Sequence, residues 1–206
     1  NLPDLYAQCE ITDLIPPTAT DDCDGQISAT TTITLPITES TTITWTYIDS
    51  EENQITQTQE VIITDSIAPV PDLDPLSDLT AQCEITELIA PTATDNCDGQ
   101  ITAITTTTLP ITQSITIDWI YTDLAGNSFS QTQEVTIEDT TSPVPDENTL
   151  LDLSAQCEIT TLTAPTATDN CDGQITGTTI TTLPISETMT IDWTFTDTSG
   201  NTVTQI

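Results

Sequence analysis

The sequence predicts an all-β protein built from tandem antiparallel β-sandwich domains, and three observations lead to this prediction. Cysteines recur at a fixed interval of 74 residues, as Cys9, Cys83, Cys157 and as Cys23, Cys97, Cys171. Several segments alternate apolar with polar side chains, which is the period of a half-buried strand. Threonine and other β-branched residues dominate the chain, no stretch has a helical period, and β-branched residues favour strands.

The 74-residue interval defines three copies of one unit. Copies 2–75 and 76–149 align without a gap, and the third copy begins at Leu150 in the same register. Boundaries placed in the proline-rich links predict three domains: 1–68, 69–142 and 143–206. The first copy lacks the proline-rich segment that precedes the other two, and the third lacks its last strand, so we expect the chain to be a window of a longer array.

Each copy contains the same succession of strand signals. In the first copy, a strand is predicted over Gln26–Thr34, and it ends before Leu35, Pro36 and Ile37. A second strand is predicted over Thr41–Asp49. Its apolar face carries Ile43, Trp45 and Tyr47. A glycine turn and a partner strand follow in copies two and three, whereas Glu52 takes the place of the glycine in copy one. About seven short strands per copy are expected. The equivalent apolar faces carry Ile117, Trp119, Tyr121 and Ile191, Trp193, Phe195.

The links between copies are rich in proline. Prolines alternate with other residues in 68–75 and again in 142–146. Such segments are extended and stiff, so we expect the domains to form an extended rod.

The charge excludes several functions. The chain has 33 acidic residues and no Lys, Arg or His, which gives a formal charge of -33. Nucleic acids and anionic lipid headgroups need basic side chains, so neither is an expected partner. The sequence contains no stretch of eighteen apolar residues, so insertion into a membrane is not predicted.

Catalysis is not expected. Histidine bases, lysine nucleophiles and arginine clamps are missing. Paired carboxylates could serve a glycosidase, but any such pair recurs in the other copies, which is untypical of an active site. Trp45, Trp119 and Trp193 lie on the apolar strand face and are predicted to be core residues rather than sugar platforms.

The cysteines predict structural disulfides and an oxidising compartment. Six cysteines allow fifteen pairings, and one pair per repeat is the economical solution: Cys9 with Cys23, Cys83 with Cys97, Cys157 with Cys171. Each bridge would close a loop of about fifteen residues, worth ~3 kcal/mol in the chain-entropy model. Zinc is the less favoured alternative, because the chain has no histidine.

An acidic loop recurs beside the second cysteine of each copy, and its carboxylates are candidate Ca²⁺ ligands. The alternative is that these side chains only cap a turn and face water. Glu138, Asp139 and Asp146, near a linker, are further candidates. The loop residues concerned are Asp21, Asp22, Asp24, Asp95, Asp98, Asp169 and Asp172.

Three longer motifs resemble a known family. Residues 91–99, 117–127 and 134–143 are similar to HYR-type (hyalin-like repeat) immunoglobulin-like modules, and the lead-in at 78–84 resembles repeats of the giant, SprB-like gliding adhesins of Bacteroidetes. The resemblance implies type 9 secretion and location on the outer surface of a bacterial cell. The tripeptides that begin at Asp65 and Asp139 resemble an O-glycosylation signal, with Ser66 and Thr140 as acceptors.

The function expected from these features is non-enzymatic. The chain is interpreted as a stalk segment of a surface adhesin or filament in adhesion or gliding motility. Its expected partners are other repeats of the same chain, a surface polysaccharide or the substratum, and motility or secretion machinery reached through other regions. The alternatives are a carbohydrate- or ligand-binding array and a self-associating filament or surface-layer subunit, with calcium as the one expected cofactor.

Overall fold

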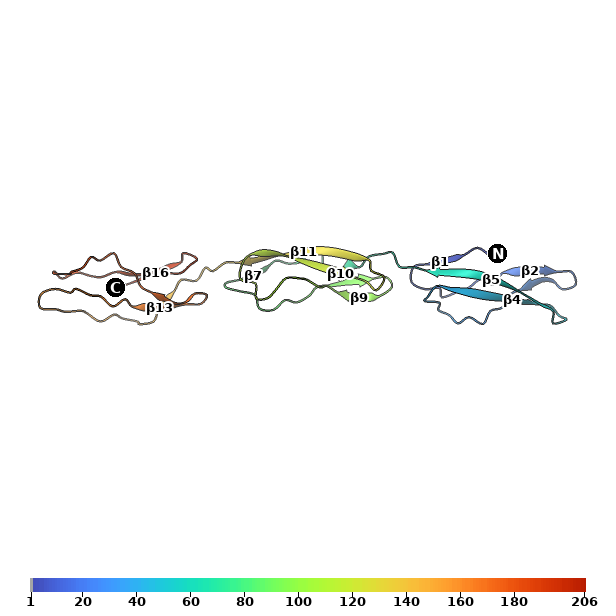
Figure 1. The fold of residues 1–206 in the computed structure, drawn as a ribbon, viewed down its shortest axis with the longest axis horizontal. Coiled ribbons are helices and arrows are strands. Elements are labelled where there is room, and N and C mark those ends of the chain that lie inside the picture. The colour runs from blue at the N-terminus through green and yellow to red at the C-terminus, as the bar shows by residue number, and fades with distance from the viewer. Residues whose placement is uncertain (1) are drawn as a thin grey trace. The chain divides into compact units, whose positions relative to one another are not determined.

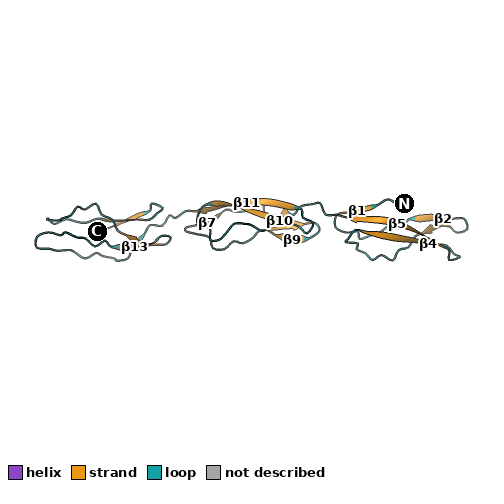
Figure 2. Cartoon of the chain, viewed as in Figure 1, coloured by secondary structure: helices purple, strands orange, loops and turns teal. Residues whose placement is uncertain are grey.

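The computed structural model of the chain describes residues 2–206 and is all-β (Figure 1, Figure 2). Within these residues the elements are the strands β1 to β16, with no helix among them. No helix long and apolar enough to span a membrane therefore occurs in the described part of the chain. The predicted class, tandem immunoglobulin-like sandwich domains, is confirmed.

The first repeat consists of two small sheets that face each other across its core. One sheet has the order β1-β5-β4 and the other pairs β2 with β3. Strands β4 and β5 are antiparallel, from Thr41 opposite Val61 to Ile48 opposite Gln54. Strand β1 pairs with β5 in parallel, so the sheet is mixed rather than wholly antiparallel as predicted. The bounds are β1 Leu5–Ala7, β2 Thr18–Asp21, β3 Gly25–Ser28, β4 Thr41–Ile48 and β5 Gln54–Ile63.

The core of the first repeat lies under the predicted face of β4. Ile43, Trp45 and Tyr47 are buried, which confirms the alternation seen in the sequence. The indole Nε1 of Trp45 donates to Oε1 of Gln59 at 2.9 Å, and Gln59 donates from Nε2 to the carbonyl of Pro3 at 2.8 Å. The tryptophan is thus a satisfied core residue, not an exposed platform.

The second and third repeats follow the same plan. Their sheets have the orders β10-β11-β7, β6-β8-β9, β12-β13-β14 and β15-β16. The second repeat contains β6 Val70–Pro71, β7 Leu79–Ala81, β8 Thr92–Asp95, β9 Gly99–Thr102, β10 Ile115–Thr122 and β11 Ser128–Ile137. The third contains β12 Val144–Pro145, β13 Thr166–Asp169, β14 Gly173–Thr176, β15 Trp193–Thr196 and β16 Thr202–Gln205.

The proline-rich links are extended, and each adds a short edge strand to the repeat that follows it. Val70 in β6 lies opposite Thr94 in β8, and the amide of Asp72 donates to the carbonyl of Thr92 at 3.0 Å. Proline lacks an N–H donor and is tolerated at such an edge. Strand β12 pairs with β13 in the same way.

The strands are fewer and shorter than predicted. Strand β3 ends at Ser28 rather than Thr34, because the chain then changes sheets. The amide of Ala29 still donates to Pro17 beside β2, whereas Thr30 already bridges to Thr46 in β4 of the other sheet. Beyond this point the backbone is held by isolated bridges such as Ile11 with Ile37, and the prolines nearby have no amide to extend a ladder.

The described chain groups into two compact units that divide the second repeat between them. The first consists of Asn1–Pro75, Ala90–Thr105 and Trp119–Gln131. The second consists of Leu76–Ile89, Thr106–Asp118 and Thr132–Ile206. Each unit therefore contains one complete junction between successive repeats, and the junctions carry the candidate site.

Candidate functional site at the repeat junctions

The disulfides join successive repeats. Cys9 of the first repeat is bonded to Cys97 of the second, and Cys83 of the second to Cys171 of the third, both with a sequence separation of 88. The predicted pairing inside each repeat, Cys9 with Cys23, Cys83 with Cys97 and Cys157 with Cys171, is therefore wrong. The prediction of one disulfide per repeat is wrong with it.

The strand directions explain this pairing. Cys9 follows β1, whose last residue Ala7 pairs with Ile63 at the end of β5, so it lies at the linker end of its repeat. Cys23 lies in the β2–β3 turn, where Asp24 accepts a hydrogen bond from the amide of Ser50 at 2.6 Å. That turn is at the opposite end of the repeat, where the β4–β5 hairpin also turns.

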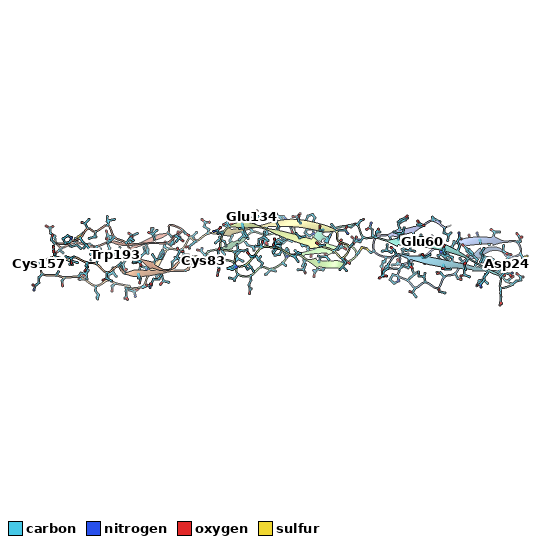
Figure 3. All side chains as sticks on the ribbon, viewed as in Figure 1. Asp24, Glu60, Cys83, Glu134, Cys157 and Trp193 are labelled. Carbon is cyan, nitrogen blue, oxygen red and sulfur yellow. A yellow bond between two sulfur atoms is a disulfide. The ribbon has the colours of Figure 1, made fainter. Side chains whose placement is uncertain are left out.

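Two cysteines have no partner within the described residues. Cys23 and Cys157 are free and exposed. Cys157 lies at the end of the third repeat that is remote from Cys83 (Figure 3). By its place in the repeat, Cys157 corresponds to Cys9 and Cys83, and Cys23 corresponds to Cys97 and Cys171. The free cysteines are thus the two complementary halves of the bridge seen at both junctions.

An amide side chain covers the sulfur atoms of each bridge. Asn96 donates from Nδ2 toward Sγ of Cys9 at 3.0 Å and Sγ of Cys97 at 2.9 Å. Asn170 lies against Cys83 and Cys171 in the same manner. Asp22 occupies the equivalent position of the first repeat, where no bridge is formed.

The acidic turn beside Cys97 is closed by Asp95. Oδ1 of Asp95 accepts hydrogen bonds from the backbone amides of Cys97 at 2.8 Å and Asp98 at 3.0 Å. These bonds, that from Asp98 foremost, hold the pKa of Asp95 below its ordinary value, so the carboxylate is ionised at neutral pH. The turn-capping interpretation is thereby confirmed for this oxygen. The other oxygen, Oδ2, is buried and has no hydrogen-bond partner.

A second carboxylate pair lies beside this turn. Asp98 accepts from the amide of Leu124 at 2.7 Å, and Asp123 accepts from the backbone and side-chain amides of Asn127 at 2.7 and 2.8 Å. Asn127 donates in turn to the backbone carbonyl of Asp65 at 3.2 Å. This bond fixes the end of the first repeat against the hairpin of the second.

Asp65 brings the first repeat's own carboxylate into the cluster. Its Oδ1 accepts from the amide of Ile67 at 3.1 Å, while its Oδ2 is buried without a partner. Oxygens of Asp65, Asp98 and Asp123 lie within 4.8 Å of one another. An oxygen of Asp65, one of Asp95 and the Cys97 sulfur meet the same limit. We call Asp65, Asp95, Asp98 and Asp123 the first junction cluster.

The second junction repeats these contacts. Asp169 accepts from the amides of Cys171 at 2.8 Å and Asp172 at 3.0 Å, and Asn201 donates to the carbonyl of Asp139 at 3.0 Å. Asp139 and Asp169 each have a buried Oδ2 without a hydrogen-bond partner. Oxygens of Asp139 and Asp169 and the Cys171 sulfur lie within 4.8 Å of one another. Asp172 and Asp197 correspond by their place in the repeat to Asp98 and Asp123, and we call Asp139, Asp169, Asp172 and Asp197 the second junction cluster.

The sequence identified only part of each cluster. The sequence predicts Asp95, Asp98, Asp169 and Asp172 as ligands, and the structure places these four residues at the junctions. The sequence does not predict Asp65, Asp123 or Asp197 as ligands, since Asp65 lies 30 residues before Asp95 and no local spacing connects them. Recurrence at the 74-residue interval was the available signal.

The other acidic candidates have different surroundings. Asp21 caps its turn by accepting from the amides of Cys23 and Asp24, and Asp22 is exposed. Near the second linker, Asp139 joins its cluster, but Asp146 accepts from the hydroxyls of Thr166 and Thr168. Glu138 is exposed. Of the three linker carboxylates, the structure thus places only Asp139 in a junction cluster.

The predicted glycan acceptors lie at the same junctions. Ser66 and Thr140 are exposed. Gln8 donates to the Ser66 hydroxyl at 3.2 Å, and Gln82 donates to the Thr140 hydroxyl at 3.0 Å. Both oxygens are at the surface and can be reached from solvent.

Comparison with known proteins agrees with the family resemblance seen in the sequence. Residues 71–137, most of the second repeat, match the family described as the HYR-like domain with four cysteines. The first and third repeats share the register of this segment and its cysteine spacing.

Among solved structures, the chain is similar to a Ca²⁺-stabilised adhesin that helps an Antarctic bacterium reach out and bind ice. The identity is 14% and the TM-score 0.21, over 82% of this chain and 55% of that one. The chain thus spans about half the length of that structure. No curated protein matches the sequence.

Proposed function

We propose that this chain is a non-enzymatic repeat segment of a large bacterial cell-surface adhesin or filament, and that it acts as a stalk in adhesion or gliding motility. The observation that carries the proposal is the covalent joining of successive repeats through Cys9–Cys97 and Cys83–Cys171. A stalk must hold its modules in series, and a bridge at every junction does so even when one module opens. Such bridges persist outside the reducing cytosol, which agrees with a location on the cell surface.

The absence of basic side chains supports the same role. Some surface carboxylates accept hydrogen bonds from threonine hydroxyls instead of pairing with cations, as where the Thr42 hydroxyl donates to Glu60 at 3.0 Å and the Thr116 hydroxyl to Glu134 at 3.0 Å. A surface of one sign keeps neighbouring stalks apart through repulsion. Export through the type 9 system and an anchor at the outer surface belong to this proposal.

The proposal is tested on intact cells of the bacterium that produces the chain. Antibody fragments raised against the purified chain should label unpermeabilised cells and reduce their attachment or gliding. Labelling that requires lysis would refute the surface location. Labelling without an effect on attachment or gliding would refute the stalk role.

The two alternatives give different results with the purified chain. A ligand-binding array would bind surface polysaccharide directly, and a filament subunit would self-associate in sedimentation experiments. We expect no polysaccharide binding, since the tryptophans Trp45 and Trp119 are buried and offer no platform for a sugar. The single-sign surface charge opposes non-covalent self-association.

Glycosylation of Ser66 and Thr140 is also proposed, because both hydroxyls are exposed beside the predicted signal. Peptide mass spectrometry of protein from the native source should find added hexose mass on these two residues. Unmodified peptides from both positions would refute it.

A further inference from the structure

Each junction contains carboxylate oxygens that are buried without a hydrogen-bond partner. Asp95 and Asp169 are both 4% exposed, and the Oδ2 of each has no donor. The Oδ2 atoms of Asp65 and Asp139 are also buried without a hydrogen-bond partner. An ionised oxygen removed from water without a partner is costly, so such atoms call for a ligand.

The residues that carry the unpartnered oxygens at the first junction, Asp65 and Asp95, belong to one cluster. Asp65 Oδ2 and Asp95 Oδ2 come from different repeats, yet oxygens of these two residues lie within 4.8 Å of each other. Asp98 and Asp123 add oxygens within the same distance of Asp65. Oxygens bound at about 2.3–2.6 Å to one Ca²⁺ are separated by up to about 5 Å, so the spacing suits a shared ion.

The charge of the cluster has no counterpart in the protein. Four aspartates converge at the first junction, and the chain contains no Lys, Arg or His. Carboxylates at this distance repel one another strongly. Only a cation from solvent can compensate them, and the open depression lined by Glu10, Thr38, Asp65 and Asp98 gives it access.

The donor set selects among metals. All available donors are oxygens, since the Cys97 sulfur is bonded to Cys9 and offers no thiolate. Zinc prefers thiolate and imidazole ligands. Four carboxylates from two repeats match the flexible oxygen coordination of Ca²⁺ better than the rigid octahedron of Mg²⁺.

The first repeat supplies an internal comparison. Asp21, Asp24 and Asp49 form the same turn contacts as Asp95, Asp98 and Asp123. No residue equivalent to Asp65 reaches Asp21 within the described chain, and Asp21 is only half-buried. The cluster is therefore created by the junction and not by the acidic loop alone.

We propose that the first junction cluster, Asp65, Asp95, Asp98 and Asp123, binds one Ca²⁺, and that Asp139, Asp169, Asp172 and Asp197 bind a second. Each ion is held by carboxylates of two successive repeats, so its binding stiffens the junction. The site goes beyond the stalk role and does not depend on it, because it requires only the folded, oxidised chain.

Isothermal titration with CaCl₂ tests the proposal on the oxidised chain in buffer with physiological NaCl. We expect two saturable sites per chain. Asp95→Asn should leave one site, and Asp65→Asn, outside the turn, should have the same effect. Asp21→Asn is the matched control, because it alters the equivalent turn without a junction partner, and it should keep both sites.

Three outcomes would overturn the proposal. The first is weak, unsaturable uptake that all variants share, which is counterion screening only. The second is equal loss in the Asp21→Asn and Asp95→Asn variants, and the third is selective binding of Mg²⁺ over Ca²⁺. Circular dichroism and the melting temperature in chelator establish that each variant is folded. If the Asp95→Asn variant does not fold, the number of Ca²⁺ sites in the Asp65→Asn variant tests the proposal, and two remaining sites would overturn it.

Discussion

Glu52 adopts the same left-handed backbone conformation as Gly126, 74 residues later in the next repeat. Their φ angles are +68° and +94°, and the amide of each donates to an aspartate carbonyl three residues earlier at 3.3 Å. A residue with a Cβ atom in this conformation has a steric energy about 1 kcal/mol higher than glycine. The hairpin turn of the first repeat is therefore strained where that of the second is not.

Glu52→Gly should stabilise the first repeat by up to about 1 kcal/mol, because glycine removes the steric cost of the positive φ. Calorimetry should show a higher melting temperature for one transition only. Glu51→Gly is the control, since Glu51 is not among the residues with positive φ, and it should give no gain. Equal effects of the two variants would disprove the strain.

Cys97→Ser should cost ~4–5 kcal/mol, because it removes a bridge that closes a loop of 88 residues in the unfolded chain. Thermal unfolding under non-reducing conditions measures this loss. Cys157→Ser changes a free cysteine and should leave the transition unmoved. Peptide mapping with an aspartate-directed protease should recover Cys9 linked to Cys97; recovery of Cys9 linked to Cys23 would contradict the structure.

The free cysteines should make copies of the chain join end to end. Thiol titration of the native chain should find two thiols, Cys23 and Cys157. With oxidised glutathione, each new bridge consumes two protein thiols and releases two molecules of reduced glutathione. A mixture of Cys23→Ser and Cys157→Ser variants should form more disulfide-linked dimer than either alone. Equal yields would show that the two thiols are not complementary.

The linker carboxylate of Asp72 should stay ionised to a lower pH than an ordinary aspartate. Hydrogen bonds from the hydroxyls of Thr92, foremost, and Thr94 lower the pKa of Asp72 from its ordinary 3.8. A carboxyl group whose pKa is lower in the folded state than in the unfolded state stabilises the fold at pH values above its unfolded-state pKa. This stabilisation is lost as the pH falls through the folded-state pKa. Carboxyl ¹³C NMR should place the pKa of Asp72 below 3.8.

Replacing both hydroxyls tests the cause. Thr92→Val combined with Thr94→Val should return the pKa of Asp72 toward 3.8 and leave that of Asp146 low, because Asp146 keeps Thr166 and Thr168. An unshifted Asp72 would mean that other groups set its pKa. Asp146 is the control within the same molecule.

Much of the fold could be predicted from the sequence, because alternation is a local signal. The buried face of β4, with Ile43, Trp45 and Tyr47, follows directly from a period of two. The parallel pairing of β1 with β5 could not be predicted, since Leu5 and Val61 are 56 residues apart and both strands have the same local pattern. Sequence periodicity contains no information on which strands become neighbours.

The junction site was harder to predict for the same reason. The acidic turn around Asp95 was visible as a cluster in the sequence, whereas Asp65 joins it only through the folded linker. The predicted cysteine pairing is wrong because it rests on loop-closure entropy, which favours the partner nearest in sequence. The strand directions place Cys9 and Cys23 at opposite ends of one repeat, so the nearest partner in sequence is out of reach in space.

The disulfides also determine how far an array of these repeats can be stretched. A pulling force that enters at Cys9 crosses to Cys97, returns along the chain to Cys83 and crosses again to Cys171. Only 14 peptide units per repeat lie on this covalent path, out of 74 in the sequence interval. At ~3.4 Å per residue, a fully unravelled repeat would lengthen to about 50 Å rather than about 250 Å. The bridges, rather than the unfolding of the hydrophobic cores, would therefore set the greatest length to which the array can extend.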